Sequence, residues 1–246
     1  MTLRRFYAPK ENFKNAAVTL DFEQTRHLRD VLRLRQSEKI QVFDGAGNEF
    51  LCEIVTIEKK ETLLKILEEI SPSAPESDLD LTLAIALLKG EKFDLVVQKA
   101  VELGVTKLVP LNTKRADVKI KDDERKLERW RKIVIDATKQ SGRAALMEIE
   151  KPLNFAEFIK KSASERPGGE NLLLFAESGG EKFSTIKPSQ KMIAVVGSEG
   201  GWEESEVEAA RKNDFQIVTL NGRILRAETA AISIAAILQH QFGDLK

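Results

Sequence analysis

Two arginines near the C-terminus, Arg223 and Arg226, stand three residues apart in an otherwise largely apolar stretch that reads LNGRILRAETAA. A guanidinium is always charged and binds carboxylates or phosphates through paired hydrogen bonds. A surface loop does not need the intervening Ile224 and Leu225, and a buried core does not tolerate unpaired arginines. The stretch is therefore typical of a rigid, cationic loop at a ligand site, with the apolar pair walling a slot for a flat ring.

A structural role for these arginines is the alternative, because buried arginines are usually paired with carboxylates. Glu177, Glu199 and Glu228 are the candidate partners in the sequence. The residues alone leave both interpretations open.

A second candidate loop, GSEGGW from Gly197 to Trp202, follows an apolar strand-like run and precedes a helical segment that opens with Glu203 and Glu204. In open α/β sheets ligands bind at the carboxyl ends of strands, and glycines let a backbone approach a ligand closely. The glycine-rich motifs of nucleotide phosphate loops are absent. The two glutamates disfavour an anion at the helix N-terminus, so the loop suits a neutral or cationic ligand, or else is a simple tight turn.

A third polar cluster is Lys139-Gln140-Ser141-Gly142-Arg143, at the end of a long charged helical pattern. Gln140 and Arg143 have the hydrogen-bonding groups to contact a nucleobase edge and a phosphate, or they form a polar helix cap. Neither His27 nor His240 has a recognisable triad partner, and no cluster has metal-ligand spacing. The sequence therefore does not support hydrolase chemistry and predicts no metal.

The composition is that of an ordinary globular protein, with 246 residues, 32% charged and 42% hydrophobic. The 39 basic and 39 acidic residues cancel, so bulk charge predicts no nucleic-acid partner, although phosphate binding needs only a local patch. A single cysteine, Cys52, excludes an internal disulfide. The N-terminus lacks a signal peptide and no apolar run is long enough to span a bilayer, which predicts a soluble, cytoplasmic protein.

A Pro- and Ser-rich stretch, SPSAPESD at 71–78, predicts a linker that divides the chain into residues 1–72 and 73–246. The first piece has strand patterns at 4–8, 41–43, 49–57 and 62–70 and a helical pattern at 21–34 with Asp21 as N-cap, which suggests a small barrel. The second piece alternates continuous apolar strands (79–88, 107–111, 172–176, 193–196, 217–220) with helices (91–103, 122–139, 203–212, 228–242). That alternation predicts an α/β domain with a largely parallel sheet.

Basic residues gather at the start of the chain, where residues 1–40 hold nine Lys or Arg and five Asp or Glu. One interpretation is a solvated helix face paired with Glu23 and Asp30. The other is a phosphate-contacting surface, which would consist of Arg4, Arg5, Arg26, Arg29, Arg33 and Arg35.

Together these residues resemble the RsmE family, SPOUT-class methyltransferases that modify N3 of a uridine in 16S rRNA. The resemblance covers essentially the whole chain and its specificity comes from the order and spacing of many short matches. The matching residues are Arg4 to Tyr7, His27-Leu28, Val31 to Leu34, Phe43 to Gly45, Gln98 to Val105, Gln140 with Arg143, Gly197 to Gly201, and Arg223 to Ala230.

The resemblance implies a PUA-like RNA-binding β-barrel over residues 1–72 and a SPOUT α/β domain over 73–246. It also implies a C-terminal trefoil knot, a feature that only a family match justifies predicting. S-adenosylmethionine would lie bent in the knot. The enzyme would be a homodimer in which each site borrows residues from the partner chain.

The resemblance also assigns roles to residues. The catalytic candidates are Arg226, Glu199 and Arg143, and the RNA-binding candidates are Arg4, Arg5, Arg26, Arg29, Arg33, Gln140, Arg143 and Arg223. The cofactor-binding candidates are Phe175, Ala176, Glu177, Gly197, Ser198, Glu199, Gly200, Leu220, Gly222, Ile224, Leu225, Arg226, Thr229 and Ala230.

Three positions depart from the usual family pattern. Ser198 stands where proline is usual, which makes the loop less rigid. Asn221-Gly222 stands where Leu-Gly is usual, and Lys139 replaces a frequent glutamate. None of the three removes a group needed for covalent chemistry.

The expected reaction is direct methyl transfer to a ring nitrogen of uracil. The enzyme must remove the N3 proton or stabilise the resulting anion, with Arg143, Arg223 or Arg226 for the anion and Glu199 as a proton acceptor. The target base must leave its stack, which favours a single-stranded or distorted RNA site. A knotted ribose 2′-O-methyltransferase and a non-catalytic RNA-binding module of ribosome assembly are the alternatives.

Overall fold

The computed structural model describes residues 4–119, 123–165 and 169–245, which divide into two compact units. Unit 1 comprises residues 1–76 and 135–146, and unit 2 comprises 77–134 and 147–246. The chain first passes from unit 1 to unit 2 between Glu76 and Ser77, inside the predicted linker. Unit 1 is discontinuous in the sequence, because it recruits twelve residues from beyond the linker, a feature that the linker pattern did not predict.

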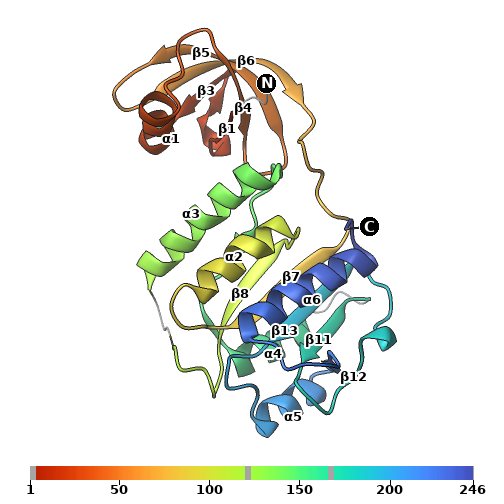
Figure 1. The fold of residues 1–246 in the computed structure, drawn as a ribbon. Coiled ribbons are helices and arrows are strands. Elements are labelled where there is room, and N and C mark those ends of the chain that lie inside the picture. The colour runs from red at the N-terminus through yellow and green to blue at the C-terminus, as the bar shows by residue number, and fades with distance from the viewer. Residues whose placement is uncertain (1–3, 120–122, 166–168, 246) are drawn as a thin grey trace. The chain divides into compact units, whose positions relative to one another are not determined.

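Unit 1 is a six-stranded sheet folded around its own apolar core, as the upper part of Figure 1 shows. The strand order is β1-β4-β5-β6-β3-β2, with β1 and β4 parallel and the other neighbours antiparallel. Inward-facing side chains such as Phe6, Val18 and Leu64 are fully buried. The strands are β1 (Arg5–Tyr7), β2 (Phe13–Lys14), β3 (Ala17–Leu20), β4 (Lys39–Phe43), β5 (Glu49–Ile57) and β6 (Thr62–Ile70).

The predicted helix at 21–34 is shorter than its pattern suggested. Asp21 caps it as expected, since its side chain accepts a hydrogen bond from the backbone N–H of Gln24 at 2.8 Å. Helix α1 covers Phe22–Arg26 and then widens into a π-helical turn, His27–Val31. Arg33 ends the segment with a φ of +54°, which no longer fits a right-handed helix.

The end of helix α3 (Glu124–Ser141) belongs to unit 1, and one arginine explains why. Arg5 forms an ion pair with the fully buried Glu49, with Nε and Oε1 2.8 Å apart. Its Nη1 and Nη2 atoms donate hydrogen bonds to the backbone oxygens of Thr138, Lys139 and Arg143 at 2.8–3.1 Å. Arg5 thus ties the C-terminal end of the helix to the sheet, where a cation is favourable.

Unit 2 is an α/β fold with a parallel sheet in the order β10-β8-β7-β13-β11-β14-β12, and β9 pairs with β8. The predicted parallel sheet is confirmed. Its strands are β7 (Asp80–Ala86), β8 (Lys107–Asn112), β9 (Glu148–Ile149), β10 (Leu153–Asn154), β11 (Asn171–Phe175), β12 (Glu181–Lys182), β13 (Lys191–Val196) and β14 (Gln216–Thr219).

Helices cover both faces of this sheet, as Figure 1 shows. Helices α2 (Lys92–Glu102) and α6 (Ala227–Phe242) pack together on one face, and α4 (Phe155–Ser164) and α5 (Glu204–Lys212) on the other. Side chains alternate between the faces, so that Leu174 and Val195 pack toward α4 and α5. Helix α4 and the short strands β2, β3, β9, β10 and β12 were not predicted; the strands are too brief to show a period, whereas the apolar spacing of Phe155, Phe158 and Ile159 in α4 was a readable helical signal.

Candidate cofactor pocket

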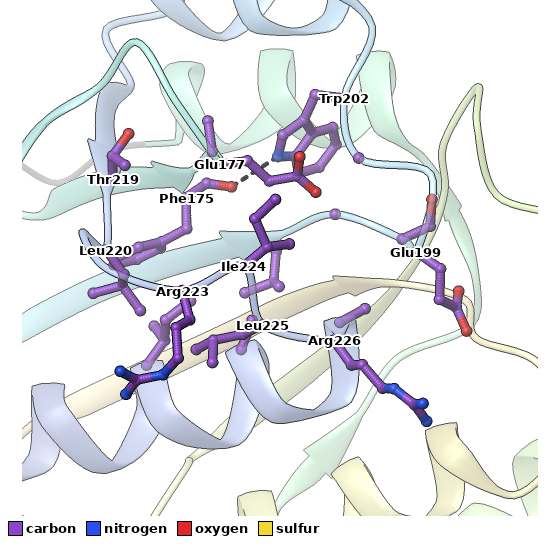
Figure 2. A pocket seen from close by; sticks show the side chains of 18 of the residues that line it. Phe175, Glu177, Glu199, Trp202, Thr219, Leu220, Arg223, Ile224, Leu225 and Arg226 are labelled. Carbon is purple, nitrogen blue, oxygen red and sulfur yellow. Dashed lines mark hydrogen bonds between the residues drawn. The ribbon is translucent and has the colours of Figure 1, made fainter.

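A cavity of about 400 Å³ lies where three neighbouring strands of unit 2 end. The loops that leave β11, β13 and β14 form its walls, and the first turns of α6 form its floor (Figure 2). Parallel strands bring their carboxyl ends to one edge, so segments about twenty residues apart in sequence converge there. The lining residues are Phe175–Glu177, Val196–Glu199, Gly201, Trp202, Thr219–Ala227, Ala230 and Ile234.

The glycine-rich loop is held in place by Trp202, which the sequence analysis did not assign to the pocket. Its indole N–H donates to the carbonyl of Phe175 at 2.8 Å, a bond that Figure 2 marks, and its ring packs on Phe155 with centroids 5.0 Å apart. Trp202 therefore joins the loop after β13 to the end of β11, and one wall of the pocket is rigid.

Gly200 is the one glycine of this loop that does not line the cavity, although it was predicted to bind the cofactor. It faces the backbone of Arg115 instead, where a Cβ would lie 2.9 Å from the carbonyl oxygen. That spacing is below normal van der Waals contact, so only glycine fits. Thr229, the other predicted residue outside the lining, is exposed on α6.

The second loop carries the two arginines and is open to solvent. Asn221-Gly222 makes the expected sharp turn, with φ of +111° at Gly222, and Ile224 behind it is 82% exposed. No ion pair or side-chain hydrogen bond within the described parts of the chain engages Arg223 or Arg226. Figure 2 shows their guanidinium groups pointing away from each other on opposite sides of the loop.

Two of the three carboxylates proposed as partners for those arginines, Glu199 and Glu228, lie beside Lys92 instead. Glu199 Oε1 accepts a hydrogen bond from Lys92 Nζ at 2.8 Å, and Glu228 Oε2 lies 3.8 Å from the same ammonium. Burial works to raise the pKa of Glu199, but the hydrogen bond from Lys92 and a backbone hydrogen bond outweigh it, so the pKa is lowered. Glu199 is therefore ionised at neutral pH.

The other cofactor-binding candidates all line the cavity: Phe175, Ala176, Glu177, Gly197, Ser198, Glu199, Leu220, Gly222, Ile224, Leu225, Arg226 and Ala230. Seven further lining residues were not among the individual cofactor-binding candidates: Val196, Gly201, Trp202, Thr219, Asn221, Ala227 and Ile234. Sequence patterns could have indicated four of these seven. Val196 and Thr219 are the last residues of strands, and Ala227 and Ile234 recur with Ala230 at helical spacing.

Two arginines that were predicted to be functional, Arg5 and Arg143, do not fit their expected roles, because a carboxylate already binds each guanidinium. Arg143 was a candidate for catalysis and RNA binding, but it is 5% exposed and its guanidinium binds Glu76, with Nη2 and Oε2 2.6 Å apart. Arg5 was an RNA-binding candidate, yet Glu49 and three carbonyls occupy it. Both are buried ion-pair residues of unit 1 rather than groups that face a phosphate.

The remaining RNA-binding candidates of unit 1 are on its surface. Arg4, Arg26, Arg33 and Gln140 are exposed. Arg29 is half-buried: it forms a bidentate pair with Asp30 at 2.7 and 2.9 Å and donates to two carbonyls of the β5–β6 turn. The alternative of a helix face paired with its own acids therefore holds for Arg29. Arg26 acts on Asp30 only through its charge, and among the described residues no ion pair engages Arg26 or Arg33.

Within the described residues, no group of three or more His, Cys, Asp or Glu side chains is arranged to hold a metal ion. None of the described helices is long and apolar enough to cross a membrane.

A smaller, mainly β unit and an α/β unit with a pocket at the strand ends of a parallel sheet make up the chain, and a family model matches part of each. Residues 75–239 match the family model of an RNA methyltransferase domain, and residues 20–67 match that of an RNA methyltransferase PUA domain. The protein is thus an RNA methyltransferase with a PUA domain.

Individual relatives narrow this class. A ribosomal RNA small subunit methyltransferase E from Synechocystis is 36% identical over 96% of this chain and 77% of its own length, and that from Rickettsia conorii is 33% identical over 96% and 95%. A crystal structure of the Neisseria gonorrhoeae protein of that name, bound to S-adenosyl methionine, superposes with a TM-score of 0.89 at 34% identity over the full length of both chains. The chain belongs to the ribosomal RNA small subunit methyltransferase E family, which confirms the resemblance and the predicted PUA and α/β methyltransferase domains, whereas the trefoil knot stays a prediction.

Proposed function

We propose that this protein transfers a methyl group from S-adenosylmethionine to N3 of a uridine in 16S rRNA of the small ribosomal subunit. The observation that carries the proposal is the pocket itself: the loops after β11, β13 and β14 converge on one cavity with Arg223 and Arg226 at its mouth, and neither arginine has an ion-pair partner among the residues that the structure describes. The Neisseria relative, which shares the fold over its full length, is described as bound to S-adenosyl methionine.

The pocket suits this cofactor in size and chemistry. Its volume of about 400 Å³ lies within the range of about 300–1,000 Å³ usual for small-molecule sites. Ile224 and Leu225 offer apolar surface for the adenine ring. Glu177 and Glu199 supply negative charge that matches a sulfonium cation. When bound, S-adenosylmethionine supplies an activated methyl group on that sulfonium.

Arg226 is the residue we assign to charge stabilisation during transfer. Loss of the N3 proton leaves negative charge on the flanking uracil oxygens, and a guanidinium without a protein partner is free to donate hydrogen bonds to them. We assign Arg223, on the other side of the loop, to binding of the RNA backbone. We assign Arg143 no part in the reaction.

Glu199 is the proposed proton acceptor. It is ionised and lines the cavity, but its lowered pKa makes it a weak base. The stabilisation of the uracil anion by Arg226 therefore contributes more to the rate than proton transfer to Glu199 does. Alignment of the methyl donor and the ring nitrogen supplies the rest.

We assign rRNA binding to the domain at residues 1–72 and catalysis to the domain at 73–246. Arg4, Arg26 and Arg33 of unit 1 are exposed cations that suit phosphates, with Arg29 and Gln140 as further candidates. We also propose that the C-terminal segment forms a trefoil knot and that the enzyme acts as a homodimer in the cytoplasm. The exposed Ile224 beside the pocket favours cover by a second copy, and light scattering of the purified protein tests the dimer.

The deciding experiment is methyl transfer from labelled S-adenosylmethionine to small ribosomal subunits that lack the mark, followed by nucleoside mass spectrometry and mapping. We expect 3-methyluridine at one position. Label on a ribose 2′-oxygen would support the sugar-methylating alternative. Cofactor binding without transfer would support the non-catalytic RNA-binding module.

Cofactor binding can be followed separately through the two tryptophans, Trp130 and Trp202. The variant Trp130→Phe leaves Trp202, which lines the pocket, as the only tryptophan. We expect its fluorescence to change on titration with S-adenosylmethionine. An unchanged spectrum together with no heat in calorimetry would contradict the proposed site.

A further inference from the structure

Lys92 connects the two functional loops although it does not line the pocket. It is the first residue of α2, and its ammonium lies 2.8 Å from Glu199 in the glycine-rich loop. The same ammonium lies 3.8 Å from Glu228, which follows the arginine loop in the first turn of α6. One cation on a third element thus contacts a carboxylate of the glycine-rich loop and a carboxylate in the helical turn that follows the arginine loop.

Glu228 makes this arrangement more than a surface ion pair. Its side chain is 12% exposed, and Oε2 is buried with no hydrogen-bond partner among the described residues. A buried carboxylate without compensation is strongly unfavourable. Lys92 forms an ion pair with Glu228 at 3.8 Å. Its ammonium is closer to Glu199, at 2.8 Å.

Other charged groups near this cluster have different contacts. Lys89 pairs with Asp117 at 2.8 Å, and both side chains are 62% exposed. Arg115 donates weakly to the carbonyl of Gly200 at 3.4 Å, and Arg226 precedes Glu228 at the start of α6. Within the described chain, no ion pair joins any of these three cations to the carboxylate of Glu199 or Glu228.

We propose that Lys92 is a positioning residue: it holds Glu199 and Glu228 together and thereby keeps both pocket loops in the conformation that binds the methyl donor. This inference rests on the proposed function, because it assigns a determinant of affinity to the same site. Lys92 itself does not line the cavity.

Neutralising Lys92 has two consequences. The two carboxylates lose their shared cation and repel each other, which moves the loops apart. Glu199 also loses the hydrogen bond that keeps its pKa low. The acid limb of the pH–rate profile therefore moves to higher pH, since Glu199 must be ionised to accept a proton. A purely structural contact does not produce this second effect.

The test compares Lys92→Met with Lys89→Met, which removes a lysine three residues earlier that pairs with Asp117, makes no ion pair with either loop and acts on Glu199 only through its charge. Calorimetry measures the affinity for S-adenosylmethionine, and single-turnover methyl transfer is followed from pH 5.5 to 9. We expect Lys92→Met to weaken binding by about tenfold or more, against less than about twofold for Lys89→Met, because an exposed pair contributes little. Lys92→Arg should restore both affinity and the acid limb.

A suppressor variant separates the role of Glu228 from a loss of folding. If the buried charge causes the defect, Lys92→Met/Glu228→Gln should bind the cofactor within about threefold of Glu228→Gln alone. This double variant decides the matter if Lys92→Met alone does not fold.

The outcomes are distinguishable. Failure of the wild type and of Lys89→Met to bind the cofactor or transfer methyl would contradict the proposed function. A functional wild type with equal affinities for Lys92→Met and Lys89→Met, or a double variant as weak as Lys92→Met, would overturn the role of Lys92.

Discussion

The arginines of unit 1 and those of the pocket loop look alike in the sequence but differ in their surroundings. Arg5 and Arg143 are buried, and Glu49 and Glu76 respectively neutralise them. Arg223 and Arg226 are exposed at a cavity and have no carboxylate partner among the described residues. A buried arginine stabilises the fold through its pair, whereas an exposed one without a partner keeps its hydrogen-bonding capacity for a ligand. The comparison predicts opposite responses to mutation.

The largest effect is expected on stability, from Arg5→Met. The substitution leaves Glu49 buried and unpaired and frees three carbonyls, which should lower the free energy of unfolding by about 3–5 kcal/mol. Urea unfolding followed by circular dichroism measures the change. Arg4→Met is the matched control, because the neighbouring side chain is exposed and should cost less than about 0.5 kcal/mol. Equal effects would break the comparison.

The next effect is on catalysis, from Arg226→Ala. Removal of one donor to developing negative charge should lower the rate of methyl transfer by about 10²–10³-fold and leave the unfolding transition unchanged. Arg223→Ala should instead weaken rRNA binding and leave the single-turnover rate at saturating RNA nearly intact. Single-turnover assays measure the rate of methyl transfer, and filter binding measures the affinity for rRNA. Equal changes of both quantities in the two variants would show that Arg223 and Arg226 do not have separate roles.

A smaller effect is expected on RNA affinity from charge reversal on unit 1. Arg26→Glu and Arg33→Glu should each weaken binding to 16S rRNA and reduce its salt dependence by about one phosphate contact, without changing affinity for S-adenosylmethionine. Arg29→Glu should have less effect if Asp30 already occupies that guanidinium. Unchanged RNA affinity for Arg26→Glu and Arg33→Glu would contradict the proposal that these arginines bind rRNA.

The smallest effect concerns pH and the pair between Lys92 and Glu199. The pKa of Glu199 is lower in the folded state, so the pair stabilises the protein above the unfolded-state pKa, and this contribution disappears as the pH falls through the folded-state pKa. Because the pair is partly exposed, we expect Glu199→Gln to cost no more than about 1 kcal/mol at pH 7. Urea titrations at pH 7 and pH 3 should show a smaller difference between wild type and variant at the lower pH.

Much of the fold was readable from local patterns. The strand at 62–70, the parallel alternation of unit 2 and the cap at Asp21 were predicted, because periodicity and capping are properties of neighbouring residues. The helix at 21–34 was predicted too long, since its apolar spacing continues while the backbone widens at His27. Trp202 was missed because its contacts with Phe175 and Phe155 join residues 27 or more positions away.

The sequence by itself determined where the pocket forms, because glycine-rich and arginine-bearing loops that follow apolar strands must meet at one edge of a parallel sheet. It also determined the family, through the order of many short motifs. Only the tertiary structure decided which charges are available. Arg143 and Arg226 cannot be told apart by local sequence, since the carboxylate that neutralises one lies 67 residues away. Likewise, the contact between Lys92 and Glu199 joins residues 107 positions apart, and such pairing depends on how the sheet brings distant segments together.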